Sequence, residues 1–276
     1  MRPIVVRGGG DLATGTILRL SRAGFPVIVL ESARPTAIRR EAAFSEAVYF
    51  GMKTVEGTVC KKMASPDEAL KNAAPGNPVL LVDERAESLA AIRPEILIDA
   101  IIAKRNLGTS IEMANLVIGL GPGFTAGKDV HYVIETMRGH DLGRIIGSGS
   151  ALQNTGIPGN VGGYTRERVL HATASGRLMA FRQIGDIVEK GEVIAVIESN
   201  ESRTEVRASL TGVLRGILPD GFDVPHGMKL ADIDPRLDER KNRFTVSDKA
   251  RCIAGSVLEL VVRHMLAASD TMQPWG

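Results

Sequence analysis

The first half of the chain alternates short apolar runs with longer stretches whose apolar residues recur at helical spacing. The runs are continuous and rich in β-branched residues, which is typical of strands covered on both faces of a parallel sheet. After the first run, Leu12, Ile17 and Leu20 predict a helix that ends near Gly24. We expect the strands at residues 4–6, 27–30, 79–82, 96–98, 116–118 and 132–134. The alternation predicts a doubly wound α/β domain.

The second half contains an internal repeat, because residues 170–198 match residues 206–234 at an offset of 36. The identical pairs are Ala172 and Ala208, Gly176 and Gly212, Leu178 and Leu214, Gly185 and Gly221, Val188 and Val224, Gly191 and Gly227, Ala195 and Ala231, and Ile197 and Ile233. Short runs between glycine turns predict strands, so two copies predict a small all-β unit with pseudo-twofold symmetry. The pattern resembles the barrel-sandwich hybrid of biotinyl and lipoyl domains. Where those domains carry the modified lysine, this chain has Glu201.

The fold class expected from these patterns is a Rossmann-like parallel sheet domain, then a biotinyl/lipoyl-like β unit without a modifiable lysine, then a C-terminal helix. The expected boundaries are 1–165, 166–236 and 237–276. Ser247 can cap the helix, whose wide apolar face includes Ile253 and Val257. Such a face must be covered, so the helix either packs on the first domain or forms a homodimer contact.

A glycine-rich turn joins the first predicted strand to the following helix. Gly8, Gly10 and Ala13 fit the G-x-G-x-x-G/A spacing of a dinucleotide site, and Glu31 ends the second strand about 20 residues further on. Glycine lets a phosphate approach the unpaired N–H groups of a helix N-terminus. The residues predicted to hold a cofactor here are Gly8, Gly9, Gly10, Asp11, Leu12, Ala13, Thr14, Gly15 and Glu31. A tight turn without a ligand is the alternative.

A second glycine-rich segment follows the strand predicted at 116–118 and predicts a second anion site. Its candidate residues are Gly121, Pro122, Gly123, Phe124 and Gly127, beside Lys128. The polar residues expected to add charge and hydrogen bonds around both turns are Arg39, Arg40, Lys104, Arg105, Asn106 and Arg138. Two such turns in one domain predict a ligand with a pyrophosphate, whereas a plain structural turn remains the alternative for the second.

Asp99, Glu135, His140 and Asp141 are the candidates for acid–base chemistry or for contacts with a cofactor ring. They form no local motif that names a reaction, and no serine lies in a nucleophile elbow. Because the two cysteines, Cys60 and Cys252, form no C-x-x-C pair, we expect packed free thiols and no metal site, although Cys60 could also relay a persulfide or selenide.

The charge balance restricts the classes of partner. Lys and Arg number 34 against 32 Asp and Glu, which gives a formal charge of +2, and no run of like charges predicts a nucleic-acid surface. No stretch approaches the roughly 18 apolar residues of a membrane span. We therefore expect a cytoplasmic protein with a small-molecule or protein partner, and no contact with nucleic acid or membrane.

The chain resembles, along nearly its whole length, the YqeB-type proteins of the selenium-dependent molybdenum hydroxylase system. The matching strings are VRGGGDLATG (6–15), AIRR (37–40), FSEAVY (44–49), DAI (99–101), AKRN (103–106), LGPGF (120–124), AG (126–127), VIET (133–136), RGH (138–140), NTG (154–156) and SDKAR (247–251). The resemblance implies a maturation role, with a Rossmann-like part similar to the XdhC accessory proteins that bind molybdenum cofactor and deliver it to hydroxylases. Its implied cofactor is a molybdopterin dinucleotide, and its implied partner is a molybdenum hydroxylase apo-enzyme.

Three functions fit these residues. The first is an accessory protein that binds a molybdopterin nucleotide for ligand exchange or insertion. The second is an NAD(P)-dependent oxidoreductase, which residues 8–13 with Glu31 would favour, although no Tyr-x-x-x-Lys constellation accompanies them. The third is a non-enzymatic adapter whose β unit docks a hydroxylase while the glycine turns are structural.

Overall fold

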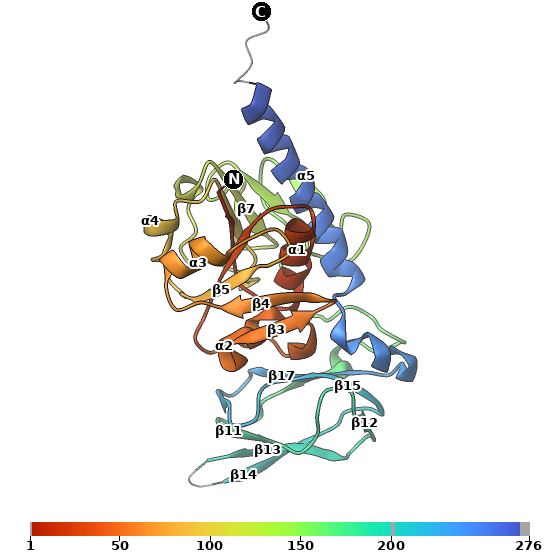
Figure 1. The fold of residues 1–276 in the computed structure, drawn as a ribbon. Coiled ribbons are helices and arrows are strands. Elements are labelled where there is room, and N and C mark those ends of the chain that lie inside the picture. Colours follow the sequence, from red (N-terminus) through yellow and green to blue (C-terminus); the bar gives the residue numbers. More distant parts are fainter. Residues whose placement is uncertain (1, 200–201, 271–276) are drawn as a thin grey trace, which may run out of the picture. The chain divides into compact units, whose positions relative to one another are not determined.

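The structure is a computed structural model that describes residues 2–199 and 202–270 (Figure 1). The chain forms two compact units. The first consists of Met1–Pro35, Ala43–Asn154 and Val246–Gly276, and the second of Thr36–Ala42 and Thr155–Thr245. The units are therefore interleaved along the chain. A short segment before residue 43 joins the second unit, and the C-terminal helix joins the first.

The first unit contains a nine-stranded sheet. In spatial order its strands are β3 (Met52–Val55), β4 (Thr58–Lys62), β5 (Val79–Val82), β2 (Val27–Glu31), β1 (Ile4–Arg7), β6 (Ile96–Asp99), β7 (Leu116–Leu120), β8 (Tyr132–Ile134) and β9 (Ile145–Ile146). The strands from β4 to β8 are parallel, whereas β3 and β9 pair antiparallel at the two edges. All six strands expected from the apolar runs are present, as β1, β2, β5, β6, β7 and β8.

The α-helices all belong to the first unit. They are α1 (Asp11–Arg22), α2 (Ala47–Phe50), α3 (Pro66–Asn72), α4 (Leu89–Ile92) and α5 (Asp248–Asp270). Short 3₁₀ turns are η1 (Arg40–Ala42), η2 (Phe44–Glu46), η3 (Ile111–Met113), η4 (Arg166–Arg168) and η5 (Leu237–Phe244). Within the described residues, no helix combines the length and the apolar character that a membrane crossing requires.

The sheet is covered on both faces, which explains its continuous apolar runs. Along β1, Ile4 and Val6 belong to one buried cluster and Val5 to another on the opposite face. The first cluster includes Ile17 of α1 and Val257 of α5. The long C-terminal helix lies along α1 in Figure 1, and the first unit itself covers Ile253, Val257 and Val261 of α5, whereas Val262 and Leu266 remain exposed.

The second unit consists of two four-stranded antiparallel sheets. One has the order β10 (Val169–His171), β17 (Lys229–Asp234), β15 (Gly212–Ile217) and β12 (Ile187–Val188). The other has the order β14 (Arg203–Arg207), β13 (Val193–Glu198), β11 (Gly176–Ala180) and β16 (Asp223–Val224). Their apolar residues form one buried core that includes Leu178, Ile194, Leu214 and Ile233.

The repeat in the sequence is also a repeat in the structure. The N–H of Gly191 donates to the carbonyl of Ala208, and 36 positions away the N–H of Gly227 donates to the carbonyl of Ala172, both at 2.8 Å. The predicted duplication is therefore confirmed in its backbone hydrogen bonds. Glu201, the residue at the position of the modified lysine, lies outside the described residues.

The predicted fold class, a Rossmann-like parallel sheet followed by a biotinyl/lipoyl-like unit and a helix, is wrong. The large sheet is mixed, and its antiparallel edge strands escaped prediction because they carry no apolar run. Lys53 and Thr54 of β3 are polar and at least partly exposed, as is common at sheet edges, and β9 has only two residues. The boundaries expected after residues 165 and 236 differ from those of the two interleaved units.

Candidate functional site

The order in which strands are added to the sheet reverses between β1 and β6, and this switch point defines the candidate site. From β1 the chain proceeds to β2 and β5 on one side of the sheet, whereas β6, β7 and β8 follow one another on the other side. Ligands of open parallel sheets bind outside the carboxyl ends of the strands at such a switch point. The segments that leave these ends are the glycine turn after β1, residues 100–106 after β6, residues 121–124 after β7 and residues 135–138 after β8.

The glycine turn after β1 packs tightly against its own chain. Gly8 has a φ of +96°, and a Cβ on it would lie 2.9 Å from the carbonyl oxygen of Ala100. The carbonyl of Gly9 accepts the N–H of Ser45 at 2.8 Å. These two glycines therefore permit close contact between backbone segments, which is a structural role.

Glu31 fixes the glycine turn. Its Oε2 accepts the N–H of Gly9 at 2.7 Å, and its Oε1 accepts the N–H of Ser32 at 2.7 Å. Burial raises the pKa of Glu31, and the two backbone hydrogen bonds oppose that shift. Both carboxylate oxygens are thus engaged by the backbone, whereas the sequence predicted an acceptor for a ribose hydroxyl.

Helix α1 begins at the end of the glycine turn without a side-chain cap. Its N-cap is Gly10, with φ −62° and ψ 176°, and glycine has no side chain to accept a hydrogen bond from the first turn. The N–H groups of such a turn are available to an anion. Thr14 instead donates its hydroxyl to the carbonyl of Gly9 at 3.1 Å, and Leu12 and Ala13 pack in the core.

A buried ionic network supports the end of β6. Asp99 is 2% exposed, and its Oδ2 accepts the hydroxyl of Thr109 at 2.6 Å and lies 3.6 Å from Nη1 of Arg7. Its Oδ1 accepts the N–H of Ile101 at 3.1 Å. Burial raises the pKa of Asp99, whereas these hydrogen bonds and Arg7 act in the opposite direction. Asp99, a predicted acid–base residue, therefore holds the start of the loop that follows β6.

The loop after β6 has a strained backbone and presents two cations. Ile102 has a φ of +59° and Lys104 a φ of +63°, and for a β-branched residue this region costs of order 1–3 kcal/mol. Lys104 and Arg105 are exposed, and neither forms a hydrogen bond or ion pair with another described residue. Asn106 bonds to the backbone of Thr109 at 2.7 and 2.8 Å, so it shapes the loop.

The second glycine-rich segment is also packed against the chain. A Cβ on Gly121 would lie 2.6 Å from the hydroxyl of Thr136, and one on Gly123 would lie 2.7 Å from the backbone of Arg105. Phe124 is buried in the core. Pro122 is half-buried, and only open space surrounds the Cβ position of Gly127. Most of this segment therefore serves loop packing.

Charged side chains from α1, α5 and the segment after β8 meet at this edge of the sheet. Arg138 forms two hydrogen bonds with Asp248, at 2.8 and 2.9 Å. Lys249 is half-buried, and burial lowers its pKa; Arg138 adds to that shift, whereas Asp11, Glu135 and Asp248 oppose it. Its ammonium forms no hydrogen bond or ion pair with another described residue. The structure thus brings together three predicted residues, Asp11, Glu135 and Arg138.

Lys249 and Asp248 were absent from the predicted site. They lie more than 100 residues beyond Arg138 in the sequence, and no periodicity connects the start of α5 with the sheet edge. The only signal was the SDKAR string at 247–251, which contributed to the resemblance but had no assigned role.

Two of the three remaining acid–base candidates, Glu135 and Asp141, line a neighbouring pocket of about 420 Å³. Glu135 is buried, and its two carboxylate oxygens accept backbone N–H groups at 2.6 and 2.8 Å. Asp141 lines the pocket and pairs with Arg144 at 3.1 Å. His140 is exposed and does not line it.

Arg39 and Arg40 belong to the second unit. Arg39 donates from Nη2 to the carbonyl of Thr245 at 3.2 Å, and Arg40 donates from Nε to the carbonyl of Ile217 at 2.9 Å. Both side chains are therefore engaged with the second unit's own backbone, whereas the sequence predicted phosphate contacts.

The two cysteines differ in environment. Cys60 is buried, and burial strongly raises the pKa of its thiol, so the reactive thiolate is suppressed. Cys252 is exposed and donates to the carbonyl of Leu142 at 3.3 Å. Among the residues that the structure describes, no three His, Cys, Asp or Glu side chains are grouped as a metal site would require.

Comparison with models of known protein families gives no match. The chain is 48% identical over 262 residues to the uncharacterized protein YqeB of Escherichia coli K12, an alignment that covers 95% of this chain and 48% of that protein. The chain therefore spans about half the length of this curated relative. The identity supports the resemblance to a YqeB-type protein, over that half.

Solved structures similar to this chain include an aspartoacylase family protein from Mesorhizobium loti. It is 11% identical, with 86% of each chain covered and a TM-score of 0.30. A succinylglutamate desuccinylase/aspartoacylase from Rhodobacter sphaeroides is 13% identical, with 84% of this chain and 85% of the other covered and a TM-score of 0.28. At these TM-scores neither likeness carries an argument about this chain.

Proposed function

We propose that this chain is a cytoplasmic accessory protein in the maturation of a selenium-dependent molybdenum hydroxylase, and that it binds a molybdopterin dinucleotide. One observation carries the binding part of this proposal. At the switch point between β1 and β6, the N-terminus of α1 has no side-chain cap and follows a glycine turn that packs against the loop after β6. Lys104 and Arg105 of that loop are unpaired among the described residues. The resemblance to the YqeB-type proteins supports the choice of cofactor and of an apo-hydroxylase as partner.

The residues at this edge fit the pyrophosphate of such a cofactor. The first-turn N–H groups of α1 would donate to one phosphate, and the positive end of the helix dipole favours its charge. Lys104, Arg105 and Lys249 would add positive charge without breaking any bond to another described residue. The cofactor itself would supply the molybdenum chemistry, while these residues bind and orient its phosphates.

Glu31 favours this function over an NAD(P)-dependent oxidoreductase. Recognition of an NAD ribose uses the carboxylate at the end of the second strand as a hydrogen-bond acceptor, and backbone N–H groups on the same carboxylate compete with the ribose. Here both oxygens of Glu31 accept backbone N–H groups of Gly9 and Ser32.

The test is to identify the ligand that the chain retains. The chain is co-expressed with a molybdenum hydroxylase and purified, and the small molecules released on denaturation are analysed by absorbance and mass spectrometry. We expect a pterin dinucleotide. Release of a nicotinamide dinucleotide, or of no ligand, would contradict the proposal.

Two kinds of variant locate the site. Gly10→Val is expected to remove the ligand without unfolding the chain, because φ −62° and ψ 176° are accessible to valine whereas its side chain would obstruct the helix N-terminus. Lys104→Ala should lower ligand retention about tenfold, as expected for one lost charge-assisted hydrogen bond. Lys71→Ala is the matched control, because Lys71 is exposed, makes no bond to another described residue and lies on α3. Equal ligand retention in the Lys104→Ala and Lys71→Ala variants would show that the ligand does not bind at the loop after β6.

A further inference from the structure

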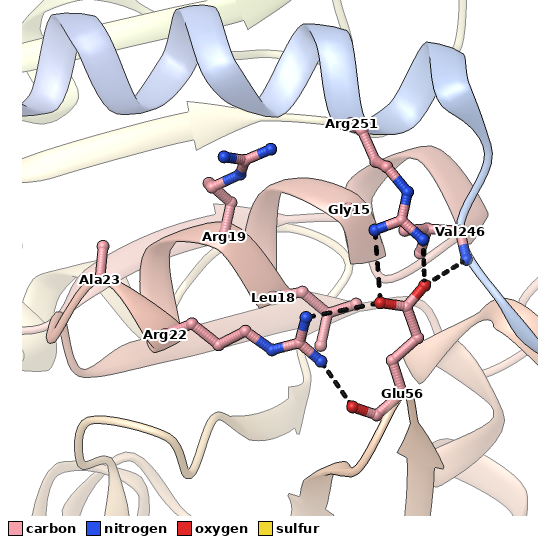
Figure 2. Close-up of a pocket in the computed structure, with 8 residues that line it drawn as sticks. All are labelled: Gly15, Leu18, Arg19, Arg22, Ala23, Glu56, Val246 and Arg251. Atoms are coloured by element: carbon pink, nitrogen blue, oxygen red, sulfur yellow. Dashed lines mark hydrogen bonds and ion pairs between the residues drawn. The ribbon is translucent and has the colours of Figure 1, made fainter.

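A second pocket, of about 350 Å³, lies in the first unit where the last turns of α1, the β3–β4 hairpin and the start of α5 meet (Figure 2). Its charged lining consists of Arg19 and Arg22 from α1, Arg251 from α5 and Glu56 from the hairpin. Arg19 lies nine residues after Gly10, which corresponds to about 13 Å along the helix. This pocket is therefore distinct from the N-terminus of α1.

Glu56 organises two of the three arginines. It lies in the hairpin turn with a φ of +46°, and its Oε1 accepts Nη2 of Arg251 at 2.6 Å and the N–H of Val246 at 3.0 Å. Its Oε2 accepts Nη1 of Arg22 at 3.4 Å, as Figure 2 shows. One carboxylate thus holds two guanidinium groups in place.

Arg19 has a different position. It is exposed, and no other described residue forms a hydrogen bond or ion pair with it. Residues three apart lie on one face of a helix, so Arg19 and Arg22 project from the same side of α1. The lining therefore has three positive side chains against one negative side chain.

A purely structural role accounts for only part of this arrangement. Cations in the last turn of a helix interact favourably with its dipole, and Glu56 joins the hairpin to α5. These roles require neither an open pocket nor an Arg19 without a partner. The excess positive charge of two instead matches a dianion.

We propose that this pocket binds a phosphate group, either free or as part of a small phosphorylated molecule. Guanidinium forks suit the tetrahedral oxygens of phosphate, which they bind through pairs of N–H groups. The volume lies within the roughly 300–1,000 Å³ typical of small-molecule pockets. Leu18 and Ala23 add an apolar wall that an organic part of the ligand would contact.

The experiment titrates the full chain with inorganic phosphate at constant ionic strength and follows the Arg Nε–H signals by NMR. We expect saturable shifts of a small set of signals, one of which disappears from the spectrum of Arg19→Ala. We also expect the affinity of this variant for phosphate to fall by up to about tenfold. Because Arg19 has no bond to another described residue, the substitution should leave the unfolding curve unchanged.

Arg85→Ala is the matched control, because Arg85 is exposed, has no bond to another described residue and does not line the pocket. Unchanged phosphate affinity in Arg19→Ala, or an equal loss in Arg85→Ala, would overturn the proposal. Succinate that binds as tightly as phosphate would also overturn it.

Glycerol 3-phosphate distinguishes the two sources of the phosphate group. Tighter binding than inorganic phosphate supports a phosphorylated molecule, and weaker binding supports the free ion.

Discussion

Two helix glycines provide a direct test of the contact between α1 and α5. A Cβ on Gly15 would lie 2.8 Å from the Cβ of Ala250 and 2.9 Å from its carbonyl oxygen. A Cβ on Gly255, within α5, would meet no atom within 4 Å. Gly15→Ala and Gly255→Ala therefore both place alanine in an α-helix, but only Gly15→Ala places its methyl group against neighbouring atoms.

The expected magnitudes follow from this difference. Replacing a glycine by alanine inside a helix stabilises it by about 0.8–1.0 kcal/mol, so Gly255→Ala should raise the free energy of unfolding by about that amount. Gly15→Ala has the same gain, but it forces an overlap with backbone atoms of Ala250 that costs about 1–3 kcal/mol. We expect Gly15→Ala to be between nearly neutral and about 2 kcal/mol less stable than the parent chain.

Urea unfolding monitored by circular dichroism at 222 nm measures this difference, because all the α-helices belong to the first unit. An unchanged slope against urea would show that only stability has changed. If Gly15→Ala proved as stabilising as Gly255→Ala, α1 and α5 would not be in close contact. Gly15 would then need the ligand role that its sequence context predicted.

Three further substitutions or modifications test other contacts. Glu56→Gln should lower the stability by about 1–3 kcal/mol at pH 7 in thermal unfolding. Burial alone would raise the pKa of Glu56, but hydrogen bonds from Arg251 and others lower it overall. The contribution of Glu56 to stability is therefore lost as pH falls below about 4, and a constant difference between variant and parent down to pH 3 would contradict it. Arg7→Met should cost about 3–5 kcal/mol in urea unfolding, because it leaves Asp99 buried without its cation, and a loss below about 1 kcal/mol would disprove the network. A thiol reagent should modify Cys252 quickly and Cys60 only after unfolding, so two fast thiols in the folded chain would refute the burial of Cys60.

Features that depend on local pattern were predictable from the sequence. The apolar runs located the six central strands, because strands buried on both faces need apolar residues at every position. The offset of 36 located the duplication, because equivalent turns in both halves need glycine. Gly191 and Gly227, for example, make equivalent hydrogen bonds to Ala208 and Ala172.

Features that depend on distant contacts were not predictable. No local signal places Thr36–Ala42 in the second unit, since its bonds reach Ile217 and Thr245 about 200 residues away. The position of Lys249 beside Asp11 has the same origin. Both contacts arise only when separate parts of the chain fold together.

Glycine signals were ambiguous for a physical reason. A glycine that admits a phosphate and a glycine that admits another backbone segment both need a missing Cβ. Gly8 meets Ala100, and Gly123 meets the backbone of Arg105, so both serve the second purpose. The glycine spacing therefore identified positions of close approach, but it could not distinguish a phosphate from another backbone segment as the neighbour.

The first turn of α5 links the two candidate sites in the first unit. Asp248 pairs with Arg138 at the sheet edge, and Lys249 lies among charged groups there, whereas Arg251 pairs with Glu56 in the second pocket. Gly15 lets this turn approach α1 closely, so small shifts of α5 would change both sites together. A ligand that shifted the first turn of α5 through Arg251 would also displace Lys249, because both residues lie in that turn.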